Sequence, residues 1–397
     1  MHHVAVRILH PPTAGDAGEL TRLVGRARSI AAEDLTERFQ RAGADDVAVI
    51  TGQDDGRSFG ARLRGVVGEL QADSGVVVLG SGSIPLASDA DLRGLVDVAR
   101  SGEAKALTNN RYSSDVVAIG GAAILASVPD LPADNLLPRW LNVVAGVPVD
   151  ELPDRARLGM DIDSPLDLEL LRRDPACSRP LVDLARSMAH RLDRAAEAFD
   201  ALAALALDPR MELFVAGRLS AATLRDLEER TACRIRALVE ERGLRASAAI
   251  AEFAAHDDGD ADDDIDVASD DEGVGASARQ RPPASLLGLQ LDRDGPDSIG
   301  MIVSLLADGA AIDTRVLLAH RHGPDETAWP SPEDRYASDL LLADRVRDPW
   351  LQQLTLHAWS YAAPIALGGH SLIGPGLRLA LGLGPGPGLG LALGLDR

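Results

Sequence analysis

Positive charge is scarce in this sequence. It has 40 lysine and arginine residues against 61 acidic residues, and Lys105 is the only lysine. Proteins that bind nucleic acid or an anionic membrane usually do so through a basic surface, and a formal net charge of −21 argues against one. We therefore expect neither nucleic acid nor a membrane as a partner.

Cysteine is also scarce, and residues 1–15 lack the charged region and apolar core of a secretory signal. Cys177 and Cys233 lie far apart in the sequence and need not pair. These observations predict a reducing, cytoplasmic location. The 397 residues, 46% of them hydrophobic, are enough for two globular domains.

The first part of the chain alternates between strand and helix patterns. Helices are expected around 31–42, 89–96 and 136–144, with Ser88 and Asp91 as a capping box, and Ser164-Pro165-Leu166-Asp167 begins a further helix. Short apolar runs predict strands at 4–9, 47–50, 76–79 and 116–119. This alternation predicts a three-layer α/β domain over 1–175 with a mostly parallel sheet.

Three runs in this region together resemble a known family. They are ELTRLVGRARSIAAEDLTERFQRAGADDVAVITG, VVVLGSGSIPLASDADLRGL and DIDSPLDLELL. Their order resembles the nucleotide-diphospho-sugar transferase fold. The nearest likeness, over about residues 4–173, is to small nucleotidyltransferases such as molybdenum cofactor guanylyltransferase and 2-phospho-L-lactate guanylyltransferase. The resemblance implies transfer of a nucleotidyl group from a nucleoside triphosphate to a small phosphorylated or sugar-like acceptor, with Mg²⁺ as cofactor.

The resemblance also implies roles for individual residues. Arg22 and Arg28 would hold phosphates, and Asn109 and Asn110 would orient the acceptor. Asp161 or Asp163 would bind magnesium, and Asp115 could replace a lost metal ligand. The turn after the third strand would line the phosphates with Gly80, Ser81, Gly82 and Ser83.

Two departures from the family leave a second interpretation open. The opening loop has arginines but no lysine, and Ser81 or Ser83 stands where the family carries a metal-binding aspartate. A neutral hydroxyl is a poor ligand for a hard cation. The alternative is therefore a catalytically degenerate protein that binds a nucleotide or sugar phosphate. In that case Asp161 ends a strand, Asp163 helps Ser164 to cap a helix, and 108–115 is an ordinary loop.

Residues 176–380 show no strand pattern and predict a mainly α-helical domain, whose surface could bind a protein partner. One expected helix runs through Leu224, Leu227, Thr231, Ile235 and Leu238. An acidic segment, 254–281, interrupts the domain, and a Gly/Leu/Pro-rich tail follows at 381–397. We expect both to be disordered. The acidic run resembles a calcium loop but lacks its glycine and closing glutamate.

Two polar concentrations stand out in the carboxyl-terminal half, at 311–341 and 364–376. In the first, His320 and His322 suit metal or acid–base chemistry, although a solvated interdomain loop explains them as well. In the second, Gly369-His370-Ser371 is similar to a hydrolase nucleophile elbow. That motif requires glycine where Ile373 stands and a histidine downstream, so we expect a helix start capped by Ser371.

Overall fold

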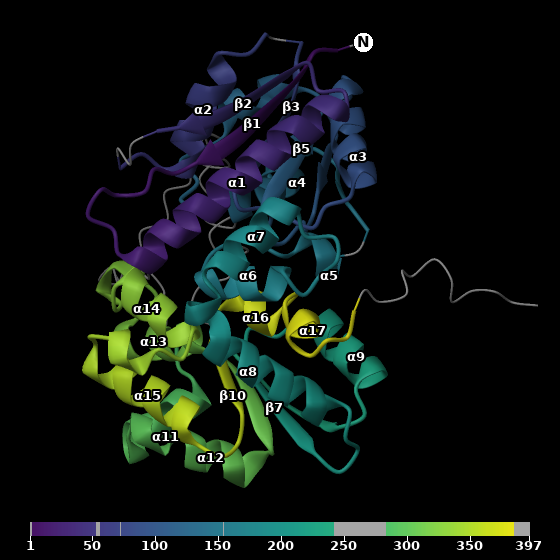
Figure 1. Ribbon diagram of the computed structural model, residues 1–397. Helices are drawn as coiled ribbons and strands as arrows, with labels where there is room; N and C mark the ends of the chain where they lie inside the picture. The colour runs from purple at the N-terminus through teal and green to yellow at the C-terminus, as the bar shows by residue number, and fades with distance from the viewer. Residues whose placement is uncertain (1, 53–55, 72, 154, 242–282, 385–397) are drawn as a thin grey trace, which may run out of the picture.

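The computed structural model describes residues 2–52, 56–71, 73–153, 155–241 and 283–384. They form two β-sheets with helices packed around each (Figure 1). The predicted disordered segment 254–281, with its calcium-like run, lies outside the described residues, as does 385–397 of the predicted tail. The first four tail residues are described, and Leu381 among them is buried in the core.

The first unit contains six strands, the four helices that the sequence pattern predicts and two further helices, Phe59–Gly68 and Arg155–Leu158, that were not expected. The strands are β1 (Val4–His10), β2 (Asp46–Thr51), β3 (Gly75–Gly80), β4 (Ala106–Thr108), β5 (Val116–Ile119) and β6 (Val149–Glu151). The helices are α1 (Glu19–Arg41), α2 (Phe59–Gly68), α3 (Asp89–Arg100), α4 (Leu137–Val143), α5 (Arg155–Leu158) and α6 (Pro165–Leu171), with short 3₁₀ turns η1 (Ala122–Ser127) and η2 (Asp134–Leu136).

The six strands form one mixed sheet in the order β2-β1-β3-β5-β4-β6. Strand β5 is antiparallel to both of its neighbours, β3 and β4, and every other pair is parallel. The α/β prediction for this region is therefore confirmed. The short strands β4 and β6 were missed, since runs of three residues show no periodicity.

Helices cover both faces of this sheet. Helices α1 and α3 share one apolar core with it, which includes the fully buried Phe39, and α2, η1 and α4 share a second core on the opposite face. The predicted caps are present: Ser88 with Asp91 at α3 and Ser164 with Asp167 at α6 each form a capping box. The three layers expected from the sequence are thus formed.

The second unit is a smaller α/β arrangement. Its strands are β7 (Glu212–Gly217), β8 (Arg234–Val239), β9 (Gly309–Asp313) and β10 (Ile365–Gly368), all parallel, in the order β10-β9-β7-β8. Its helices are α7 (Arg179–Ser187), α8 (Ala189–Ala206), α9 (Ala221–Arg230), α11 (Leu286–Asp294), α12 (Ile299–Leu306), α13 (Thr314–His322), α14 (Pro332–Asp339), α15 (Pro349–Ser360), α16 (His370–Ile373) and α17 (Leu377–Ala380). Short 3₁₀ turns are η4 (Pro296–Ser298), η5 (Glu326–Ala328) and η6 (Ala343–Arg345).

The prediction that 176–380 contains no strand was wrong, although helices still predominate there. The expected helix through Leu224 and Leu238 ends at Arg230, and its second half is strand β8. Charged and apolar residues alternate at the start of β8, in Arg234, Ile235 and Arg236, which is the period of a strand. Leucines at helical spacing on either side of Thr231 obscured that alternation.

The largest apolar core connects the two units. It contains Leu20, Leu23 and Val24 from the first turns of α1 together with residues of α6, α8 and the second sheet. Helix α1 is long enough to pack on the first sheet with its carboxyl-terminal half and on the second unit with its amino-terminal half (Figure 1). The two units therefore meet along α1 and α6.

Candidate functional site

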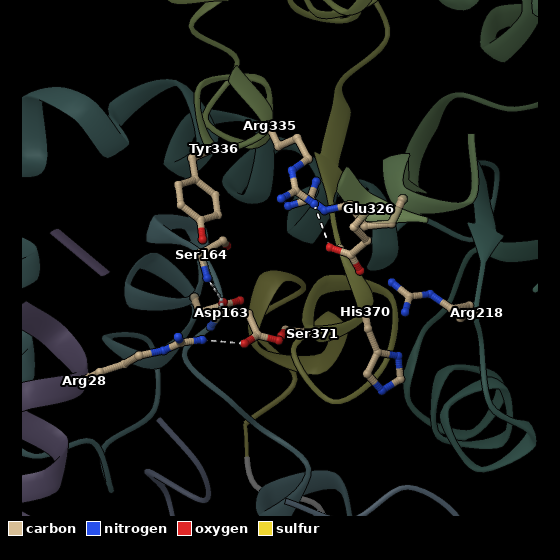
Figure 2. Close-up of a pocket in the computed structure, with 12 residues that line it drawn as sticks. Arg28, Asp163, Ser164, Arg218, Glu326, Arg335, Tyr336, His370 and Ser371 are labelled. Carbon is tan, nitrogen blue, oxygen red and sulfur yellow. Dashed lines mark hydrogen bonds and ion pairs between the residues drawn. The ribbon is translucent and has the colours of Figure 1, made fainter. Parts of the chain in front are cut away.

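A cavity of about 290 Å³ lies where the two units meet, near the lower end of the volumes usual for ligand pockets. Figure 2 shows the polar side chains that converge on it. Its lining residues are Arg28, Asp163, Ser164, Asp167, Arg218, Arg315, Glu326, Arg335, Tyr336, Gly369, His370 and Ser371.

The second sheet explains why these residues converge. Arg218 directly follows β7, Arg315 lies just beyond β9, and Gly369 follows β10, so each comes from the carboxyl end of a parallel strand. Strand β8 lies on one side of β7 and β9 on the other, so the order of strands along the chain changes direction at β7. Ligands of open α/β sheets bind outside the carboxyl ends of the strands at such a change of direction. The cavity therefore occupies the expected ligand position of the second sheet.

Two of the four arginines are held by buried carboxylates. Arg218 donates from Nε and Nη2 to Asp313 at 2.6 and 3.2 Å, and Arg315 donates from Nη1 and Nη2 to the two oxygens of Asp339, both at 2.6 Å. Both carboxylates are fully buried. Burial acts to raise the pKa of Asp313, but the charge and hydrogen bonds of Arg218, together with the charges of Arg315 and His370, outweigh burial and lower that pKa. The paired geometry fixes both guanidinium planes at the cavity wall.

The other two arginines pair with carboxylates that remain exposed. Arg28 on α1 donates from Nη2 to Asp163 Oδ1 at 2.7 Å and from Nε to the Ile162 carbonyl at 2.7 Å. Arg335 on α14 donates from Nη1 to Glu326 Oε2 at 2.9 Å. The side chains of Asp163 and Glu326 are 64% and 45% exposed, so both carboxylates remain accessible to a ligand. Each arginine of the cavity thus has one carboxylate partner.

All four guanidinium groups keep a nitrogen that makes no hydrogen bond within the described part of the chain. These nitrogens are Nη1 of Arg28 and Arg218 and Nε of Arg315 and Arg335. The Arg335 Nε is buried, and a buried donor without a partner costs about 1–3 kcal/mol. A ligand with several acceptor oxygens would satisfy the nitrogens of Arg28, Arg218 and Arg315, whereas the Arg335 Nε would become accessible only if its side chain moved.

Asp167 organises one side of the cavity. Its Oδ2 accepts hydrogen bonds from the backbone amides of Asp163 at 2.8 Å and Ser164 at 2.6 Å, which caps α6. Burial, together with the nearby Asp163 charge, raises the pKa of Asp167 to about 7. Because Asp167 supplies the capping carboxylate, the side chain of Asp163 is available to Arg28.

The three carboxylates with expected catalytic or metal roles lie close enough to influence one another. Burial raises the pKa of Asp115 to about 7, and burial with the charges of Asp163 and Asp115 raises the pKa of Asp161 well above its usual value. Among these three, only Asp163 lines the large cavity. Asp115 lines a much smaller pocket with Gly80 and Asp134. No group of three ligating side chains arranged for a metal ion occurs among the described residues.

The Gly80–Ser83 turn packs against the segment that carries Asp161. Ile162 N donates to Gly82 O at 3.1 Å, and Ser83 forms an isolated β-bridge with Asp161. A Cβ at Gly82 would come within 2.9 Å of Asp161 Oδ1. Ser81 is buried and its Oγ lies 3.0 Å from His10 Nδ1. Apart from Gly80 in the smaller pocket, this turn lines neither cavity.

The remaining predicted binding residues make local contacts. Asn109 Nδ2 donates to Asp115 Oδ2 at 2.9 Å and to the Leu158 carbonyl at 3.0 Å, and Asn110 Oδ1 accepts from the Tyr112 amide. Arg22 donates to the Ala17 carbonyl. None of the three lines the cavity, so Arg28 and Asp163 are the predicted residues that do.

Most lining residues come from the two polar concentrations of the carboxyl-terminal half. The interpretation of 311–341 as a solvated loop was wrong, because Arg315 lies on α13, Glu326 on η5 and Arg335 on α14. Ser371 lies inside α16 and does not cap it. The sequence marked both segments as rich in polar residues. Only the tertiary fold, however, brings the two segments next to Arg28.

The two histidines of segment 311–341 lie outside the cavity, and His320 links two helices. His320 and His322 lie in the last turn of α13, contrary to the expectation of a solvated loop. His320 Nε2 lies 3.1 Å from Asp292 Oδ2, and its Nδ1 accepts from the Ser285 amide at 3.2 Å. His320 therefore connects α13 to α11, outside the cavity.

Comparison with known proteins does not assign the chain to a family. No protein-family model matches the chain, and neither the curated proteins nor the solved structures contain a match. The resemblance to small nucleotidyltransferases therefore stays a prediction. Within the described ranges, no helix combines the length and apolar character needed to cross a membrane.

Proposed function

We propose that this protein binds a small phosphorylated molecule in the cavity between its two units. The observation that carries the proposal is the set of four guanidinium groups, each with a nitrogen from which no described residue accepts a hydrogen bond. A phosphate group offers several acceptor oxygens, and arginine is the side chain best suited to them.

The position of the cavity supports the same proposal. It lies at the carboxyl ends of β7, β9 and β10, where the sheet changes direction and where α/β proteins bind phosphorylated ligands. The two buried ion pairs hold Arg218 and Arg315 in place before a ligand arrives. Such preorganisation reduces the entropy lost on binding.

Isothermal titration calorimetry with phosphate, sugar monophosphates, nucleoside monophosphates and nucleoside triphosphates tests the proposal. We expect at least one phosphorylated compound to bind. Arg335→Gln should weaken its binding about ten- to a hundredfold, since a charge-assisted hydrogen bond contributes about 1.5–3 kcal/mol. Arg64→Gln is the matched control, because Arg64 also pairs with an exposed carboxylate but lies outside the cavity. If no phosphorylated compound binds, or if both variants weaken binding equally, the proposal fails.

A second candidate is the nucleotidyl transfer implied by the resemblance. One observation favours it: Asp115, Asp161 and Asp163 lie close enough for charge on one to raise the pKa of another. Carboxylate oxygens are suitable magnesium ligands, and Asp161 and Asp163 would hold the ion. Only Asp163 of the three lines the cavity, however, and the raised pKa of Asp161 favours its neutral form, so the fit to magnesium is poor and we derive no step through it.

Pyrophosphate release distinguishes the two candidates. The protein is incubated with each nucleoside triphosphate, Mg²⁺ and a panel of phosphorylated acceptors, and nucleotide binding is followed in parallel. Turnover that needs Mg²⁺ and is lost in Asp161→Asn would favour transfer. Binding of a phosphorylated compound without turnover would support the binding function and contradict nucleotidyl transfer.

A further inference from the structure

The cavity presents two kinds of polar group. Guanidinium nitrogens donate hydrogen bonds, whereas carboxylates can only accept them when ionised. Figure 2 shows the Asp163 carboxylate directed toward Ser371 and the Glu326 carboxylate directed into the cavity from the other side. Both carboxylates are accessible, so a ligand in contact with them must itself carry donors.

The hydroxyl groups in the lining extend this pattern. Ser164, Tyr336 and Ser371 supply hydroxyls that both donate and accept hydrogen bonds. Burial raises the pKa of Tyr336, so its phenol stays protonated at neutral pH. Together with the two carboxylates, these groups match the alternating donors and acceptors of a polyhydroxylated molecule.

The charge of the cavity limits the charge of its ligand. The four lining arginines are paired one to one with Asp163, Asp313, Glu326 and Asp339. The paired charges cancel, and the whole chain carries a formal net charge of −21, which repels polyanions. A triphosphate would therefore meet far less compensating charge than the number of arginines suggests, and a monophosphate is better matched.

Gly369 leaves room beside Arg315. A Cβ at this position would lie 3.7 Å from Arg315 Nε, an ordinary contact distance, and the backbone φ of −107° is accessible to any residue. Alanine is therefore compatible with the fold here. Its methyl group would cover the side of the guanidinium whose Nε makes no hydrogen bond among the described residues.

The geometry points to a sugar or polyol monophosphate as the ligand class. Its phosphate would bind Arg315 beside Gly369, and its hydroxyls would donate to Asp163 and Glu326. This inference rests on the proposed phosphate-binding function and adds selectivity to it: the carboxylates select for hydroxyl groups and against multiply charged phosphates.

Calorimetry with the full chain tests the selectivity. The probes are glucose 6-phosphate, glucose 1-phosphate, glycerol 3-phosphate and inositol 1-phosphate, compared with inorganic phosphate, glucose and ATP without added metal. We expect the best polyol phosphate to bind at least tenfold more tightly than phosphate, glucose or ATP. Gly369→Ala should weaken it about tenfold while the urea midpoint stays near that of the wild type.

Substitution of the carboxylates tests how the selectivity arises. Asp163→Asn and Glu326→Gln should each lower the affinity for the polyol phosphate several-fold. Each should also raise the affinity for ATP, because the substitution removes a negative charge and leaves an arginine uncompensated. Asp130→Asn is the matched control: Asp130 is an exposed partner of Arg64 at 2.6 Å, outside the cavity, and should change neither affinity.

The outcomes separate this inference from the proposed function. If no phosphorylated compound binds, the proposed function itself fails. If phosphate or ATP binds as tightly as the best polyol phosphate, or if Asp163→Asn and Glu326→Gln leave the ratio of affinities unchanged, phosphate binding stands and the polyol selectivity is overturned.

Discussion

Glu333 connects the two units in a way that can be measured. It lies on α14 and accepts hydrogen bonds from the amides of Leu20 at 3.0 Å and Thr21 at 3.1 Å, and from Thr21 Oγ1 at 3.1 Å. These amides begin α1, and its N-cap residue, Gly18, has no side chain to cap them. A carboxylate from the second unit thus caps the helix that carries Arg28.

We expect Glu333→Ala to lower the free energy of unfolding by about 1.3–2 kcal/mol. Loss of a helix cap costs about 1 kcal/mol, and loss of a negative charge at a helix amino terminus costs a further 0.3–1 kcal/mol. Glu333→Gln keeps only one acceptor oxygen, so it should lose the charge contribution and also the hydrogen bonds that one of the two carboxylate oxygens accepts. Glu37→Ala, at an exposed position further along α1, is the control and should stay within about 0.5 kcal/mol of wild type.

Gly18→Ala supplies the second arm of a double-mutant cycle. A Cβ at Gly18 would lie 2.1 Å from Glu333 Oε2, and the φ of −65° suits alanine, so the methyl group would act by displacing the carboxylate. The single variants should therefore cost similar amounts, and the double variant should cost little more than either. Urea denaturation followed by circular dichroism measures all four proteins. Additive costs, or a Glu333→Ala variant as stable as the Glu37→Ala control, would refute the reasoning.

Three further predictions concern the first unit and the cavity wall. Gly75→Ala should destabilise the protein strongly in urea denaturation, because its Cβ would lie 1.8 Å from the backbone oxygen of Ala99. Gly65→Ala is the control: it lies on the exposed face of α2, its Cβ would have nothing within 4 Å, and it should stabilise the protein by about 0.5–1 kcal/mol. Phe39→Ala should cost about 3–5 kcal/mol in the same assay, since Phe39 is fully buried; a cost below about 1 kcal/mol would contradict its place in the core. The raised pKa of Asp167, about 7 against a usual value of 3.8, means that the folded state binds a proton more tightly, so its contribution to stability is lost as pH rises from about 4 to 7. Asp167→Asn should remove that part of the slope of unfolding free energy against pH, and an unchanged slope would show that Asp167 does not titrate there.

The fold of the first unit was accessible from the sequence because its elements carry strong local signals. Val76–Leu79 is a continuous apolar run, as a buried strand requires, and Ser88 with Asp91 marks the start of α3. The strands of the second unit were missed for physical reasons. Two of them, Gly309–Asp313 and Ile365–Gly368, are built partly from alanine and glycine, which do not favour strands, and they are buried by their position in the sheet.

The site was accessible only in part. Arg28 and Asp163 were expected to bind phosphate and metal, and they line the cavity together with residues that no motif had joined to them. Arg218 stands alone in the sequence, directly after a strand that was not expected. Local patterns carry no information about which strand ends lie side by side, so the convergence of four arginines could not be predicted.

The sequence by itself determined the local elements, the caps and the acidic balance of this protein, because those depend on residues close together in the chain. Tertiary structure alone decided the second sheet and the cavity. Arg28, Arg218, Arg315 and Arg335 are distant in sequence, and long-range packing of α1 and α6 on the second unit brings them together. Pairing with Asp313 and Asp339 then determines how much of their charge a ligand meets.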